Sequence, residues 1–192
     1  MNHIRRLAVY CGSAPGSTAN FSDATRATAK AMTEHGIDLV YGGGRLGLMG
    51  LIADSVLANG GKVYGVIPHA LVDLEVAHTG LTELHRVATM HDRKAKMTDL
   101  ADAFLALPGG IGTLDELFEA WSWNALGYHA KPFCLLNVDG FWDGLVAFCD
   151  HAQASGFMSA RRRSQLLVAE TPDEALKLLD DAAAAATQGM VW

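Results

Sequence analysis

Short runs rich in β-branched and other apolar residues alternate with longer helix-like runs along all 192 residues of the chain. This alternation is typical of a parallel sheet with covering helices. We expect strands over 5–11, 37–41, 62–67, 83–88, 103–107, 132–136 and 165–169, and helices over 20–35, 48–59, 91–101, 113–126, 141–154 and 172–185. The sequence therefore predicts an α/β, Rossmann-like three-layer fold with a central, mostly parallel sheet of about seven strands flanked by helices.

The length and the apolar content, 50% of residues, indicate one domain with a full hydrophobic core. We therefore predict a single Rossmann-like nucleotide-binding domain over residues 1–192, with a tail that frays from about residue 186. The connection 68–82 is polar and too long for a simple turn, so we expect a lid or a binding loop there. This connection contains Glu75.

Charge and cysteine content exclude several classes of protein. A net charge of −6 argues against broad nucleic-acid binding, which needs a basic field. The one basic run, Arg161–Arg163, fits a solvated helix face or a subunit contact better than an anion site. The three cysteines lack C-x-x-C spacing and lie in apolar runs, so we expect buried thiols and no disulfide or structural zinc.

Neither a membrane span nor a metal site is visible in the sequence. No stretch approaches the roughly 18 consecutive apolar residues of a spanning helix, and the N-terminal residues lack a signal-peptide core. We therefore expect a cytoplasmic protein with no membrane contact. The eight histidines have no ligand spacing, so His78 and His91 are predicted to form hydrogen bonds, with no metal or other cofactor required.

Three predicted strands end in glycine-rich turns, at the edge where ligands bind in folds of this kind. The first turn, Cys11–Gly16, offers backbone N–H groups and the hydroxyl of Ser13. The second, Tyr41–Gly50, contains Gly43 within a formal G-x-G-x-x-G. The next strand, however, ends without the carboxylate that holds a dinucleotide ribose. NAD binding is therefore disfavoured, whereas phosphate binding remains an option.

The third turn, PGGIGTLDE, closes the strand 103–107 and combines two kinds of chemistry. Its backbone N–H groups at Gly109, Gly110 and Gly112, together with the hydroxyl of Thr113, can bind a phosphate at a helix N-terminus. We place Glu116 in the first helical turn, as a carboxylate facing a sugar that develops positive charge. A helix-capping role is the alternative for Glu116, although Asp115 suits that role better.

Three cations lie at the start of the predicted helix 91–101, within the segment MHDRKAKM: Arg93, Lys94 and Lys96. Cations at a helix N-terminus oppose the helix dipole. An anionic ligand or a partner carboxylate would therefore explain them, and surface solvation is an alternative for Lys96. Further along, Trp121, Trp123 and Tyr128 are too apolar for a solvated face and suggest core or interface packing, or walls for a base.

Taken together, YGGGRLGLMG, MHDRKAKM and PGGIGTLDE closely resemble the LOG ("lonely guy") family of cytokinin-activating phosphoribohydrolases. The resemblance extends over nearly the whole chain, from VYCGSAPG to LLNVDGFWDGL. It implies a homodimer that cleaves a nucleoside 5'-monophosphate, either AMP or a cytokinin nucleotide, into the free base and ribose 5-phosphate. The family's catalytic residues fall on Arg93 and Glu116. Its substrate contacts fall on Glu75, Lys94 and the turn Gly109–Thr113.

One departure from the family pattern is Ser122, where plant relatives often carry threonine; the hydroxyl is kept, and we expect it near the substrate. Older descriptions of relatives as lysine decarboxylases do not fit, because no pyridoxal-type lysine site is legible. A noncatalytic carrier for a nucleotide or a molybdenum cofactor is the alternative on the same fold. Such a carrier has less need of Glu116 together with Arg93.

Overall fold

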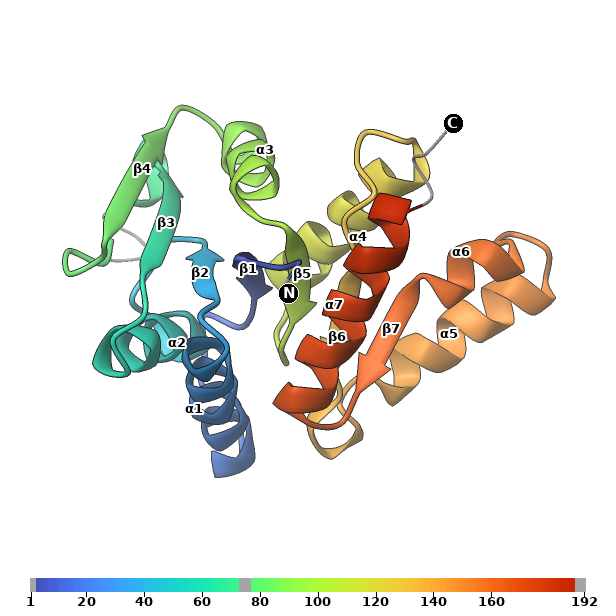
Figure 1. The fold of residues 1–192 in the computed structure, drawn as a ribbon, viewed down its shortest axis with the longest axis horizontal. Helices are drawn as coiled ribbons and strands as arrows, with labels where there is room; N and C mark the ends of the chain where they lie inside the picture. The colour runs from blue at the N-terminus through green and yellow to red at the C-terminus, as the bar shows by residue number, and fades with distance from the viewer. Residues whose placement is uncertain (1–2, 73–76, 189–192) are drawn as a thin grey trace.

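A computed structural model of the chain describes residues 3–72 and 77–188 (Figure 1). Its centre is a seven-stranded sheet with the order β4-β3-β2-β1-β5-β6-β7, in which every neighbouring pair is parallel. The strands are β1 (Arg6–Tyr10), β2 (Asp38–Tyr41), β3 (Val63–Pro68), β4 (Glu83–Val87), β5 (Ala103–Ala106), β6 (Phe133–Leu136) and β7 (Leu166–Ala169). The expected parallel α/β architecture is confirmed.

Helices cover both faces of the sheet. The helices α1 (Ala19–Glu34), α2 (Gly47–Ala58) and α7 (Pro172–Gln188) contribute to one hydrophobic cluster. The helices α3 (Met90–Leu100), α4 (Ile111–Ala125) and α5 (Asp143–Ala154) contribute to the other. The short helix α6 (Ala160–Ser164) precedes β7, and two 3₁₀ turns, η1 (His69–Leu71) and η2 (Val138–Gly140), follow β3 and β6.

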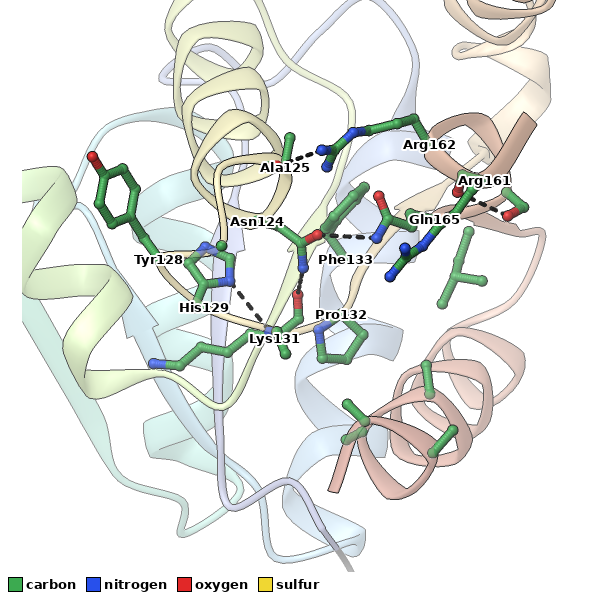
Figure 2. Close-up of a pocket in the computed structure, with 18 of the residues that line it drawn as sticks. Asn124, Ala125, Tyr128, His129, Lys131, Pro132, Phe133, Arg161, Arg162 and Gln165 are labelled. Carbon is green, nitrogen blue, oxygen red and sulfur yellow. Dashed lines mark hydrogen bonds between the residues drawn. The ribbon is translucent and has the colours of Figure 1, made fainter. Parts of the chain in front are cut away.

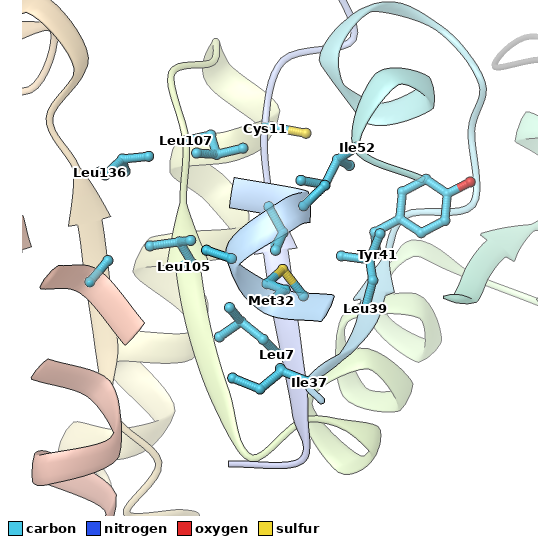
Figure 3. Packing of buried hydrophobic residues seen from close by; sticks show 14 of the residues in the cluster. Leu7, Cys11, Met32, Ile37, Leu39, Tyr41, Ile52, Leu105, Leu107 and Leu136 are labelled. Atoms are coloured by element: carbon cyan, nitrogen blue, oxygen red, sulfur yellow. The ribbon is translucent and has the colours of Figure 1, made fainter. Parts of the chain in front are cut away.

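The central strands are mostly apolar because both of their faces are buried, whereas the edge strand β4 carries Glu83, His85 and Arg86. On β1, Leu7 and Val9 belong to the cluster beneath α1, α2 and α7, whereas Ala8 and Tyr10 belong to the opposite cluster. Figure 3 shows the first cluster, with Leu7 and Leu105 from neighbouring strands packed around Met32 of α1. The alternation of side chains along a strand thus builds two cores from one sheet.

Between β4 and β5 the chain crosses from one side of β1 in the sheet to the other. It first adds β2, β3 and β4 on one side of β1, and then returns through α3 to place β5 on the other side. The turns after β1 and β5 therefore lead into helices on opposite faces, which opens a crevice at the carboxyl ends of these strands.

Several element boundaries differ from the prediction. Helix α4 begins at Ile111 and not at 113, because the glycines of the turn accept helical geometry. Helix α1 begins after Thr18 without a side-chain cap. The helix α6 was not predicted. At the start of α7, Thr171 Oγ1 accepts from the N–H of Glu174 at 3.3 Å.

The imidazole of His129 lies in the connection between α4 and β6 and is held neutral. Burial, and then the charge of Lys131, lower the pKa of His129 to about 4. Its Nδ1 accepts a hydrogen bond from the N–H of Lys131 at 3.2 Å, and its ring contacts Phe104. Unfolding therefore allows His129 to take up a proton at pH values between its folded pKa and about 6.5.

We expect the protein to lose stability as the pH falls from about 6.5 towards 4, in part through this histidine. In His129→Asn the amide oxygen can accept the hydrogen bond that Nδ1 accepts in the wild type, but it does not titrate. Part of the loss of folding stability at low pH should therefore disappear. Because the ring is partly solvated, we expect a difference of about 1–2 kcal/mol between pH 7 and pH 4.5. Urea unfolding of both proteins measures it, with the exposed His151→Asn as control. Identical pH profiles would contradict this assignment.

Candidate active site

The three glycine-rich turns predicted from the sequence meet at the carboxyl edge of the sheet. The N–H of Gly12, after β1, donates to the carbonyl of Pro108, after β5, at 3.1 Å. The N–H of Leu48, in α2, donates to the carbonyl of Gly12 at 3.0 Å. A Cβ on Gly47 would come within 2.3 Å of the backbone of Ser13, so these turns are in direct contact. The exposed Ser13 thus lies at the junction.

The N-terminus of α4 presents backbone donors at this junction. Its N-cap is Gly110, and no side chain of the described residues caps it. By contrast, Thr89 and Asp92 form a capping box at the start of α3. The first-turn N–H groups of an uncapped helix, together with the helix dipole, favour an anion. This geometry suits an anion, and the phosphate site there stays a prediction.

The turn before α4 depends on the absence of side chains. A Cβ on Gly109 would lie 2.1 Å from Oγ1 of Thr113 and 2.8 Å from the backbone nitrogen of Gly12. Thr113 is only 3% exposed, so its hydroxyl lies directly beneath this glycine. Nothing lies within 4 Å of a Cβ built on Gly110 or Gly112. The turn is thus packed tightly against β1 on one side and open on the other.

Arg93 enters the same edge from the first turns of α3. The side chain is 4% exposed, and its Nη2 donates to the carbonyl of Gly42, after β2, at 3.0 Å. A Cβ on Gly42 would lie 2.0 Å from that nitrogen. This position therefore has to be glycine if the guanidinium is to keep its place.

Glu116 lies one turn deeper in α4 than predicted. Because α4 begins at Ile111, its first turn contains no acidic residue, and the expectation that Glu116 occupies that turn is wrong. The effect of its charge on neighbouring titratable groups indicates where Glu116 lies. Burial, and next the charge of Glu116, raise the pKa of both Tyr10 and Cys11 at the end of β1. The carboxylate is thus close to the crevice between β1 and β5.

Lys94 joins α3 to α4. Its Nζ lies 3.0 Å from Oδ2 of Asp115 and 2.7 Å from Oε2 of Glu119. Burial acts to lower the pKa of Lys94, but the hydrogen bonds that its ammonium donates to Glu119 and Asp115 outweigh burial and raise that pKa. Of the two explanations open for this cation, the partner carboxylate is confirmed. Asp115 and Glu119 were missed as partners, although their spacing of four residues on a helix was a usable signal.

The remaining predicted site residues are more widely spread. Gly43, at a φ of 78°, accepts from the N–H of His78 at 2.9 Å, which fixes the described end of the connection 68–82 to the second turn. His78 also contacts Asp54 at 2.9 Å through Nε2, as the hydrogen-bonding role required. Ser122 is exposed near the C-terminal end of α4, on the side that carries Phe118. Glu75 lies outside the described residues.

Trp121 belongs to the core, with 5% of its surface exposed, whereas Tyr128 is 76% exposed. Within 3–72 and 77–188, no group of three or more histidine, cysteine, aspartate or glutamate side chains has an arrangement suited to a metal ion. In the same residues, no helix combines the length and apolar character needed to cross a membrane.

Comparison with known proteins places the chain in a family. A family model described as "Possible lysine decarboxylase" matches residues 49–179. The cytokinin riboside 5'-monophosphate phosphoribohydrolase LOG of Oryza sativa subsp. japonica is 46% identical over 191 residues, which cover 100% of this chain and 79% of the rice protein. The cytokinin riboside 5'-monophosphate phosphoribohydrolase LOG2 of Arabidopsis thaliana is 46% identical over 94% of this chain and 84% of its own length.

Among solved structures, the molybdenum cofactor carrier protein of Chlamydomonas reinhardtii matches with a TM-score of 0.69, over 93% of this chain and 98% of the carrier. At 18% identity this likeness concerns the fold alone. The rice and Arabidopsis relatives, in contrast, match over 100% and 94% of this chain. The chain therefore belongs to the LOG family of cytokinin riboside 5'-monophosphate phosphoribohydrolases, within the broader family described as possible lysine decarboxylases.

Proposed function

We propose that this protein hydrolyses the N-glycosidic bond of a nucleoside 5'-monophosphate, a cytokinin riboside 5'-monophosphate or AMP, to the free base and ribose 5-phosphate. The activity for which its relatives in rice and Arabidopsis are named supports this proposal. The observation that carries it is the convergence of an uncapped helix N-terminus, a buried arginine and a carboxylate on one crevice.

The substrate phosphate would bind the backbone N–H groups of the turn Gly109–Thr113, aided by the dipole of α4. The exposed hydroxyl of Ser13 lies at the edge of this turn, through the contact of Gly12 with Pro108. Gly43 would contribute backbone at the neighbouring strand end. Lys94 would act through the electrostatic field at the start of α4, since its ammonium contacts Asp115 and Glu119.

The valine variant of Thr113 tests the phosphate assignment. Thr113→Val keeps the volume of a side chain that is 3% exposed but removes the hydroxyl beneath Gly109. We expect KM to rise about tenfold with kcat nearly unchanged, because phosphate binding is equal in the ground state and the transition state. Steady-state kinetics on AMP measures both constants. A fall in kcat at unchanged KM would place Thr113 at the reacting bond.

Cleavage would break the bond between C1' of the ribose and the base, with water supplying the hydroxyl group at C1' and a proton reaching the base nitrogen. Positive charge develops on the sugar as this bond lengthens. Glu116 would stabilise that charge or orient the attacking water, and Arg93, fixed on the carbonyl of Gly42, would orient the carboxylate or the substrate. No metal or cofactor enters this scheme.

The exposed face of α4 supports a homodimer, which we propose as the working assembly. Ile111 is 85% exposed and Phe118 is 37% exposed. These apolar side chains lie on the helix that carries Glu116 and Ser122. A second copy of the chain packed there would form one side of the candidate active site. We further propose a cytoplasmic location, and substrate recognition that involves Glu75 and Ser122.

The decisive experiment incubates the purified protein with AMP and, separately, with isopentenyladenosine 5'-monophosphate, and resolves the released base by chromatography. Release of base by the wild-type protein, absent from Glu116→Gln, is the expected result. Tight binding of the nucleotides without release of base by the wild-type protein would overturn the hydrolase and favour a carrier. The ratio of the two release rates ranks the substrates.

A further inference from the structure

A cleft of about 1440 Å³ with a mixed polar and apolar lining lies at the edge of the sheet opposite to the candidate active site (Figure 2). Asp102, Pro132 and Gln165, which line it, precede the first residues of β5, β6 and β7. Its walls are the connection 124–133, the helix α6 and the residues 182, 183, 185 and 186 of α7. The length of the strands thus separates it from Arg93 and Glu116, and the proposed hydrolysis makes no use of it.

Hydrogen bonds hold the two sides of this cleft together. The Nη2 of Arg162 in α6 donates to the carbonyl of Ala125 at the end of α4. The Nε2 of Gln165 donates to Oδ1 of Asn124 at 3.1 Å, and Nδ2 of Asn124 donates to the carbonyl of Lys131 at 3.2 Å. Figure 2 shows this chain of contacts running from α6 to the strand entry. Hydrogen bonds therefore join the two walls of the cleft.

The charge that faces the cleft is positive, in a chain whose net charge is −6. Arg161 and Arg162 line it, and among residues 3–72 and 77–188 no carboxylate forms an ion pair with either. Arg163 differs, because its Nε pairs with Asp150 at 2.6 Å. The side chain of Arg161 extends from α6 towards the middle of the cleft (Figure 2).

The acidic side chain at the far end of the cleft is already engaged. Oδ2 of Asp102 accepts from the backbone N–H groups of Arg5 and Arg6, both at 2.9 Å. Lys131 also lines the cleft, and its ammonium donates to the carbonyl of Thr98 at 2.6 Å. The guanidinium of Arg161, and the donors of Arg162 that Ala125 does not use, are thus left to bind an anion.

A buried acceptor lies on the same wall. Oε1 of Gln165 is inaccessible to solvent and has no hydrogen-bond partner within the described part of the chain. The amide orientation is fixed, because Nε2 donates to Asn124. A buried acceptor without a donor is costly, so a small shift of the Gln165 side chain that lets a ligand hydroxyl donate to Oε1 would be favoured.

We propose that this cleft binds a small phosphorylated compound of the sugar-phosphate class. The phosphate would lie on the guanidinium groups of Arg161 and Arg162, since arginine recognises phosphate through paired N–H donors. A hydroxyl group of the ligand would donate to Oε1 of Gln165 once that side chain shifts to expose it. The site is independent of the chemistry at the carboxyl edge, and ligands there would act at a distance from it.

Hydrogen exchange of the backbone amides, measured with and without sn-glycerol 3-phosphate, tests this site. We expect slower exchange in 124–133 and 160–168 of the wild-type protein, and a weaker effect with inorganic phosphate, which lacks the carbon-bound hydroxyl. In Arg161→Gln the concentration needed for this protection should rise at least about tenfold, because a charge-assisted contact is lost. The matched control is Arg26→Gln, on the exposed surface of α1, which should behave like wild type.

Three outcomes would overturn the site. Protection confined to the turn Gly109–Thr113 would mean that the phosphate binds at the candidate active site alone. Protection that is equal in Arg161→Gln and wild type would mean nonspecific binding of the anion. Absence of protection at any concentration would mean an empty cleft. The base-release assay on Arg161→Gln without added phosphate should match wild type, so failure of this site and failure of the hydrolase are distinguishable.

Discussion

Glu116→Gln is expected to lower kcat for base release by about 10²–10³, with little change in KM. The glutamine keeps the shape and the hydrogen-bonding capacity of the side chain but removes the charge that would stabilise the developing cation on the ribose. The field of this carboxylate already reaches the end of β1, where it adds to the effect of burial in raising the pKa of Cys11. Steady-state kinetics with AMP measures the change.

The matched control is the adjacent carboxylate. Asp115→Asn removes the same charge from the same helix, at a side chain that is 54% exposed and contacts Lys94. We expect it to retain most of the activity, with a small loss of thermal stability as the link between α3 and α4 weakens. Equal losses of kcat in the two variants would mean that the charge of α4 matters in general, and the specific role of Glu116 would have to be abandoned.

Gly42→Ala is expected to lower kcat by about 10² while leaving a folded protein. The new methyl group would occupy the place of Nη2 of Arg93, which lies 2.0 Å from a Cβ built there, and would also meet the end of Met49. Both neighbours are the ends of flexible side chains, so they can move at modest cost in stability. The guanidinium would then leave the carbonyl of Gly42, and misplacement by an ångström or more is sufficient for such a loss.

The control for this variant is Gly144→Ala in α5, where nothing lies within 4 Å of the built Cβ. It should keep full activity and gain slightly in stability, because alanine favours a helix. Circular dichroism and thermal melting establish that both variants are folded. Full activity in a folded Gly42→Ala protein would show that the position of Arg93 has no part in the reaction.

Much of the site could be predicted from the sequence because its parts are local. The glycines after β1, β2 and β5 are visible as turns, and parallel strands bring their carboxyl ends to one edge. That Gly109 and Gly42 must be glycine for different reasons could not be predicted. One packs against Thr113 and Gly12, and the other leaves room for a guanidinium 51 residues away along the chain.

The start of α4 shows how a local rule misled the prediction. Glycines inside PGGIGT suggested a loop up to Thr113, yet the helix begins at Ile111. Packing of the turn against β1 compensates for the poor helix propensity of glycine. As a result Glu116 lies deeper in the helix and faces the crevice, whereas the first turn is left to backbone donors.

The sequence by itself determined the α/β class, the seven strands and the residue types at the carboxyl edge, because hydrophobic periodicity and glycine turns are properties of short segments. Only the tertiary structure decided which partners these residues have. The pairing of Lys94 with Glu119, the contact of Arg93 with Gly42 and the cleft beside Arg161 all join segments that are distant in the chain. Such contacts depend on how the helices pack on the sheet, and no local pattern encodes that packing.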